Sequence, residues 1–125
     1  MMFATVPRWS AIAGAVLLLA IAADSLVPVA WQVRTGLHWL FEHFLAYFAV
    51  TLVLCLAWPR LFLVAACLMV VAGAMEALQG LTADRIPDLA TAFCGGAGVL
   101  VAALLASLVT HAWQRRRGRI HDPSG

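Results

Sequence analysis

Two residues with side chains suited to proton chemistry interrupt long apolar segments of this chain. Glu76 lies in the otherwise apolar stretch 61–81, and His43 lies near the start of another such stretch. A charge placed in the middle of a bilayer costs about 2.5–3.5 kcal/mol, so ionisable residues inside apolar segments mark candidate functional sites. A histidine and a carboxylate can together accept and donate protons. His43 and Glu76 are therefore the candidate catalytic pair.

Further polar residues are candidates for binding a ligand. Arginine can hold a phosphate or carboxylate through two hydrogen bonds, so Arg85, nine residues after Glu76, is the candidate anion anchor. Glu76 and Gln79 are three residues apart and would share one helix face, as would His43 and Tyr47, four apart. The candidate ligand-binding residues are Arg85, Gln79, Asp88, Tyr47, Asp24 and Glu42.

The elements that position these residues are four apolar segments. Of the 125 residues, 64% are hydrophobic, 11% are charged and none is lysine, whereas soluble domains carry roughly 25% charged residues. About 20 apolar residues cross a hydrocarbon core of about 30 Å. We therefore predict an all-α membrane protein without β-sheet. Its short connections favour an antiparallel bundle of four transmembrane helices, at about 9–31, 37–58, 61–81 and 88–109.

The first apolar segment has an alternative interpretation as a cleaved signal peptide. Arg8 precedes an apolar run, 11–23, that contains the small-residue pattern Ala20, Ile21, Ala22. Cleavage would leave three spans with their termini on opposite sides of the membrane. A retained first helix instead places both termini on one side.

Arginine placement predicts the orientation of four spans. Short loops rich in arginine and lysine stay cytoplasmic. Six arginines fall on the side of the termini, namely Arg8, Arg60, Arg115, Arg116, Arg117 and Arg119, and two on the other side, Arg34 and Arg85. We therefore expect a plasma-membrane protein with both termini in the cytoplasm. In this orientation the polar candidates all lie in the outer leaflet.

Residues 1–114 are expected to form a single transmembrane domain, and residues 115–125 a basic, disordered cytoplasmic tail. The arginine run in the tail is interpreted as a topology anchor. Aromatic residues do not alternate with these arginines as they do in single-stranded nucleic-acid sites, so no nucleic-acid partner is expected.

Small residues in the fourth segment predict a close helix contact. Asp88, Thr91, Gly95, Gly98 and Ala102 follow one helical stripe. Small residues let membrane helices approach closely, so this stripe should pack against the second or third segment.

Cofactor and metal chemistry have no clear signal in the sequence. The three cysteines, Cys55, Cys67 and Cys94, fall one in each of the last three segments without a close pair. They are interpreted as small core residues. No metal-ligand spacing such as His-Glu-x-x-His is present. We therefore expect neither a cofactor nor a metal.

The polar motifs, taken in order, resemble those of the VanZ-like family of small membrane proteins. The matching features are HFLAYF at 43–48, EALQ at 76–79 and Arg85, and the resemblance spans about 37–105. This family is associated with reduced susceptibility to the glycopeptide antibiotic teicoplanin. The resemblance implies a role in the cell envelope and no established chemical step.

Three functional hypotheses follow. The first is an outer-leaflet site that binds a phosphorylated or carboxylated envelope component, such as a lipid-linked precursor. The second is a non-catalytic structural or assembly protein whose polar network only fixes helix packing. The third is a small membrane enzyme in which His43 and Glu76 act on a lipid-linked substrate. Binding is favoured over catalysis, and the expected partners are membrane lipids and, through homo-oligomerisation, further copies of the chain.

Overall fold

The computed structural model describes residues 7–83, 86 and 88–120 of the chain. Its helices are α1 (Pro7–Leu26), the short 3-10 helix η1 (Val29–Trp31), α2 (Trp39–Ala57), α3 (Leu61–Gln79) and α4 (Leu89–Ile120). The described residues form no strand. The four long helices are each long and apolar enough to cross a membrane. The predicted all-α membrane fold with four transmembrane helices is thus confirmed.

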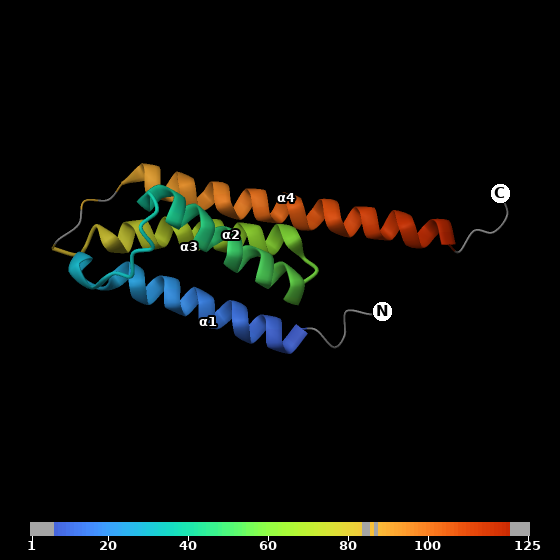
Figure 1. Ribbon diagram of the computed structural model, residues 1–125, viewed down its shortest axis with the longest axis horizontal. Helices are drawn as coiled ribbons and strands as arrows, with labels where there is room; N and C mark the ends of the chain where they lie inside the picture. Colours follow the sequence, from blue (N-terminus) through green and yellow to red (C-terminus); the bar gives the residue numbers. More distant parts are fainter. Residues whose placement is uncertain (1–6, 84–85, 87, 121–125) are drawn as a thin grey trace.

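The helices pack side by side, and their ends define two ends of the bundle (Figure 1). One end carries the connection between α1 and α2, residues 27–38, together with the end of α3 and the start of α4. We call it the loop end. The other end carries the turn between α2 and α3 at Pro59 and Arg60, and we call it the turn end. Helix α1 begins at the turn end, where α4 also ends.

Helix α1 is shorter than predicted, because it ends at Leu26 and not near residue 31. Pro28 explains this end. A proline has no backbone N–H to donate, and its ring disfavours helical geometry in the preceding residue, Val27. The chain then forms η1 and an extended connection that lies over the loop end of the bundle.

Helix α4 is longer than predicted, and the expectation of disorder throughout 115–125 is wrong for its first part. The helix continues to Ile120, so residues 115–120 are helical, and residues 121–125 lie outside the described part of the chain. Arginine and glutamine are good helix formers, and the Arg117 guanidinium lies 3.8 Å from the centre of the Trp113 ring. With 32 residues, α4 is ~48 Å long and extends past the other helices (Figure 1).

Helices α2 and α4 make the closest contact in the bundle. A Cβ atom on Gly98 would overlap the carbonyl oxygen of Phe44, and one on Gly95 would lie 2.9 Å from Cδ2 of the Tyr47 ring. Ala102, one turn farther along, is fully buried. The prediction that the small-residue stripe packs against a neighbouring helix is confirmed, and that helix is α2.

The centre of the bundle is made by residues of α2, α3 and α4. The largest fully buried side chains are Val50, Thr51, Leu68 and Val99. The Thr51 hydroxyl donates a hydrogen bond of 2.6 Å to the Tyr47 carbonyl of the preceding turn, so this polar group is satisfied inside an apolar core. Large apolar side chains cover the outside of the bundle, as expected of helices surrounded by lipid.

The contact at Gly98 predicts a stability difference between two glycine substitutions. Gly98→Ala places a methyl group against the backbone of α2 and should destabilise the protein by about 1–3 kcal/mol. Gly73 is the matched control, because a Cβ atom there meets no other atom within 4 Å. Gly73→Ala should therefore be neutral or slightly stabilising. Unfolding of the detergent-solubilised proteins tests this, and equal stability of the two variants would contradict the close contact.

Candidate functional site

A polar cavity of about 290 Å³ lies at the loop end of the bundle. Its walls come from the α1–α2 connection, from α2 and α3, and from the residues around the start of α4. The lining residues are Val29, Gln32, Arg34, Trp39, His43, Glu76, Gln79, Ile86, Asp88 and Thr91. Four of the candidate residues named from the sequence, His43, Glu76, Gln79 and Asp88, thus line one cavity.

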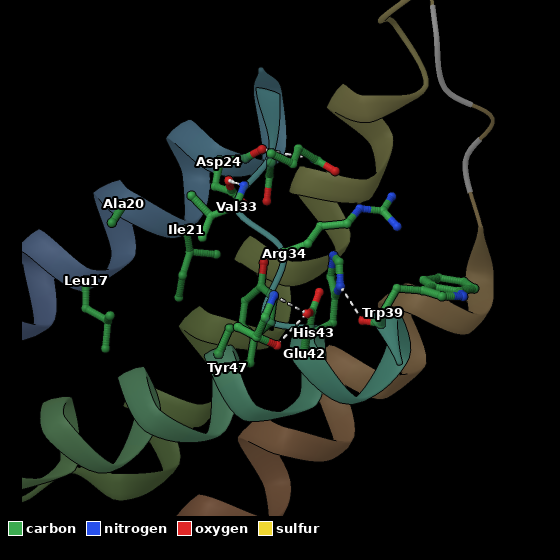
Figure 2. A pocket seen from close by; sticks show the side chains of 14 residues that line it. Leu17, Ala20, Ile21, Asp24, Val33, Arg34, Trp39, Glu42, His43 and Tyr47 are labelled. Atoms are coloured by element: carbon green, nitrogen blue, oxygen red, sulfur yellow. Dashed lines mark hydrogen bonds between the residues drawn. The ribbon is translucent and has the colours of Figure 1, made fainter. Parts of the chain in front are cut away.

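A larger side cavity of about 490 Å³ adjoins the polar cavity, between α1, the connection and α2 (Figure 2). Three further candidates line it, namely Asp24, Glu42 and Tyr47. The two cavities share a wall formed by Gln32, Arg34, Trp39 and His43. Much of the remaining lining of the side cavity is apolar, including Leu17 and Ile21 from α1. A polar chamber therefore adjoins a mainly apolar one.

Glu76 links α3 to the beginning of α4. Its side chain is buried, and Oε1 accepts a short hydrogen bond from the backbone N–H of Asp88. Asp88 in turn accepts a bond of 2.9 Å from the N–H of Ala90 through Oδ1, as an N-cap residue of α4 does. The first N–H groups of a helix lack partners within the helix. These two carboxylates supply acceptors next to the start of α4.

His43 is held in one orientation by its own helix. Nδ1 lies 2.9 Å from the backbone carbonyl oxygen of Trp39, one turn earlier. Because a carbonyl only accepts hydrogen bonds, Nδ1 must carry a proton. Nε2 is then the nitrogen available to take up or release a proton, or to contact a ligand. Such a tautomer suits both anion binding by the charged ring and general-base chemistry by the neutral ring.

Gln79 and Tyr47 are buried and contribute to helix packing. The Gln79 amide donates a hydrogen bond of 3.3 Å to the carbonyl of Ser25, which ties the end of α3 to the end of α1. The Tyr47 ring lies against Gly95 of α4. Glu76 and Gln79 are both buried, so the predicted shared helix face does turn towards the interior.

Asp24 and Glu42 hold the connection between α1 and α2 from two sides (Figure 2). Asp24 Oδ1 accepts a bond of 3.0 Å from the N–H of Val33. Glu42 Oε1 accepts two bonds from Thr35, one of 2.9 Å from its N–H and one of 2.6 Å from its hydroxyl. Val33 and Thr35 flank Arg34 in the chain. We call this arrangement the carboxylate clamp, and it gives both acidic residues a positioning role that the sequence did not indicate.

Arg34 is the functional candidate that sequence reasoning missed. It entered the sequence argument only as one of two arginines on the non-cytoplasmic side, although that placement beside the polar candidates was a usable signal. The structure brings it into the wall shared by both cavities, beside His43. The predicted anion anchor, Arg85, lies outside the described residues. Among the described residues, Arg34 is the only arginine that lines the polar cavity.

No protein-family model matches this chain, and neither a curated protein nor a solved structure matches it. Within the described part of the chain, no three His, Cys, Asp or Glu side chains are grouped so that they could hold a metal ion. Every buried side-chain nitrogen or oxygen of the described residues has a hydrogen-bond partner. The buried polar groups of the site are therefore arranged by bonds within the protein.

The carboxylate clamp predicts how the connection responds to substitution. Glu42→Ala removes both bonds to Thr35, so the amides of residues 33–36 should exchange with deuterium severalfold faster than in the wild type. Glu42→Gln keeps an acceptor oxygen and should have a smaller effect. Hydrogen–deuterium exchange in detergent measures this, with the amides of Trp58 and Arg60 at the turn end as the internal control. Unchanged exchange in Glu42→Ala would show that the clamp does not order the connection.

Proposed function

We propose that this chain is a VanZ-like membrane protein of the cell envelope, and that its polar cavity binds a phosphorylated or carboxylated envelope component. The observation that carries the proposal is the placement of Arg34. The carboxylate clamp fixes the residues on both sides of Arg34, and this arginine lines the same cavity as His43. A guanidinium offers paired N–H donors that match the oxygens of a phosphate or carboxylate.

The charges of the cavity are compatible with an anion despite its two acidic residues. Glu76 and Asp88 each accept a hydrogen bond from a backbone N–H, so the positive ends of these N–H dipoles partly offset the negative charge that a ligand would meet. The start of α4 also contributes a partial positive charge near these groups. Arg34 is then the cationic contact for a ligand, and the Nε2 atom of His43 is a second polar contact in the same lining. The Thr91 hydroxyl adds a polar group to the same lining.

The depth of the cavity suits a headgroup. It lies where α3 ends and α4 begins, at the boundary between the apolar helices and the polar connections. The adjoining side cavity is mainly apolar and offers room for part of a lipid tail. With both termini in the cytoplasm of a plasma-membrane protein, as the arginine distribution favours, the polar cavity would face outward. That location agrees with an effect on teicoplanin susceptibility, which the family resemblance suggests.

A packing role is the second candidate, and one specific observation favours it. Each of the four acidic residues that the structure describes at the loop end accepts a hydrogen bond from a backbone N–H: Asp24, Glu42, Glu76 and Asp88. A network of this kind ties elements together without any ligand. Catalysis by His43 and Glu76 stays a prediction that the same substitutions address.

Binding through Arg34 predicts a charge-specific loss of affinity. Purified protein in phosphatidylcholine nanodiscs is titrated with a fluorescent polyprenyl phosphate, and with the uncharged polyprenol as the reference ligand. Arg34→Gln should weaken phosphate binding about tenfold by removing charged hydrogen bonds, while Arg34→Lys keeps the charge and loses less. Arg116→Gln removes an equal charge from the far end of α4 and should change nothing. Equal binding by Arg34→Gln and wild type would remove Arg34 as the anchor.

Two substitutions of Glu76 separate packing from proton chemistry. Glu76→Leu removes the acceptor for the Asp88 N–H and should lower the free energy of unfolding by about 1–3 kcal/mol, whereas Glu76→Gln keeps an acceptor oxygen. Cells that lack the protein are complemented with each variant, and teicoplanin susceptibility and membrane abundance are measured. A packing role predicts full complementation by Glu76→Gln. Failure of this variant at normal abundance would instead indicate that the carboxyl group takes part in proton transfer or ligand binding.

A further inference from the structure

A third cavity, of about 570 Å³, lies at the turn end of the bundle, away from the proposed headgroup site. It is an open cavity between α1, α2, α3 and the turn between α2 and α3. Its lining residues are Leu18, Leu54, Trp58, Pro59, Arg60, Leu63, Val64, Cys67, Leu68 and Val71. We call it the turn-end cavity. Its volume lies within the range of small-molecule sites in proteins.

The body of the turn-end cavity is apolar. Leu54, Val64 and Leu68 are buried side chains of the core cluster and form its inner wall. Water in a protein cavity needs two to four polar partners, and apolar cavities stay dry. An unfilled cavity would also deprive the lining atoms of van der Waals contacts. In a bilayer, the apolar material next to these helices is the acyl chain of a lipid.

One charged residue, the exposed Arg60, lines this cavity, and we call its end of the cavity the mouth. Arg60 lies in the turn directly before the first residue of α3, at the level where the apolar helices end. No acidic residue is among the described residues that line the cavity. Trp58, beside it, belongs to a residue type that is enriched at the membrane interface. The cavity thus combines an apolar body with a cationic mouth, which matches a lipid tail joined to an anionic headgroup.

The surroundings of the mouth favour a net negative headgroup over a zwitterionic one. The last turns of α4 carry Arg115, Arg116, Arg117 and Arg119, and α4 ends on the same side of the bundle as the turn of Arg60 (Figure 1). Basic residues at the end of transmembrane helices attract anionic lipids, and basic pockets between such helices hold their headgroups. The positive field at the turn end therefore adds to the local contact at Arg60.

We propose that the turn-end cavity binds one acyl chain of an anionic phospholipid whose headgroup phosphate contacts the Arg60 guanidinium. This site is separate from the polar cavity at the loop end. It shares no lining residue with the polar cavity, and it takes a bulk membrane lipid and not an envelope precursor. Its acyl chain lies between Leu18 of α1 and the α2–α3 pair, beside the direct contact of α1 with Leu54 of α2.

Fluorescence quenching tests this proposal at the site itself. Trp58 is kept as the only tryptophan by replacing the other four with phenylalanine. The protein is placed in phosphatidylcholine nanodiscs that contain a small fraction of phosphatidylglycerol or phosphatidylcholine with brominated acyl chains. Brominated phosphatidylglycerol should quench Trp58 more strongly at equal fraction. Arg60→Gln should weaken this preference about fivefold, as expected for one basic residue at a membrane surface.

Two variants separate a cavity from general attraction to the basic end. Arg116→Gln removes an equal charge outside the cavity and should weaken the preference much less than Arg60→Gln does. Val71→Phe keeps all charges, fills part of the cavity and should reduce the quenching. Equal quenching by the two brominated lipids, or equal losses in Arg60→Gln and Arg116→Gln, would overturn the proposal.

A second measurement uses the protein with all its tryptophans. Native mass spectrometry counts the phospholipids that remain bound after release from mixed micelles of phosphatidylglycerol and phosphatidylcholine. One retained phosphatidylglycerol in the wild type, lost in Arg60→Gln and kept in Arg116→Gln, is the expected result. Retention that is the same in all three proteins would contradict the site even where the single-tryptophan variant fails to fold.

Discussion

At the loop end of the bundle, backbone N–H groups at the edge of the membrane need hydrogen-bond acceptors. The residues that supply these acceptors determine the arrangement of the site. The α1–α2 connection leaves the N–H groups of Val33 and Thr35 without helical partners, and the start of α4 leaves others. Side-chain carboxylates accept bonds from these groups. A polar backbone group without a partner in an apolar medium costs several kcal/mol, and this cost bears on the part-buried bond from the Asp88 N–H to Glu76. The bonds to Val33 and Thr35 are exposed and hold the connection in one arrangement.

This constraint explains why acidic residues that suggest a reactive site are engaged with the backbone. The carboxylate clamp formed by Asp24 and Glu42 places the intervening Arg34 in the wall of the polar cavity. The close packing of α2 against α4 at Gly98 fixes the helix that carries His43. One arginine and one histidine are thus positioned by rigid neighbours. A site built this way loses little conformational freedom when a ligand binds, which favours affinity.

Much of the fold could be predicted from the sequence, because long apolar segments leave few alternatives in a membrane. The buried face with Glu76 and Gln79 also followed from helical spacing. The early end of α1 could have been predicted, since Pro28 stops a helix. The predicted span instead followed the apolar segment through to residue 31. The length of α4 was missed because hydropathy marks the end of a membrane span and not the end of a helix.

The site was harder to predict, because its defining contacts join residues that no local pattern relates. The bond between Asp24 and Val33 links the end of a helix to a connection nine residues on, and the position of Arg34 depends on it.

The chemical difference between the two ends of the bundle bears on how the protein sits in a membrane. At the loop end, charges of both signs line the cavities, and the carboxylates accept directed hydrogen bonds from the backbone. At the turn end, Arg60 and the last turns of α4 carry positive charge with no acidic residue among the described residues around them. The first arrangement can select a ligand by shape and by hydrogen-bond geometry. The turn end can select a lipid only by the charge of its headgroup and by the fit of its apolar tail. These two features suffice to recognise an abundant membrane lipid.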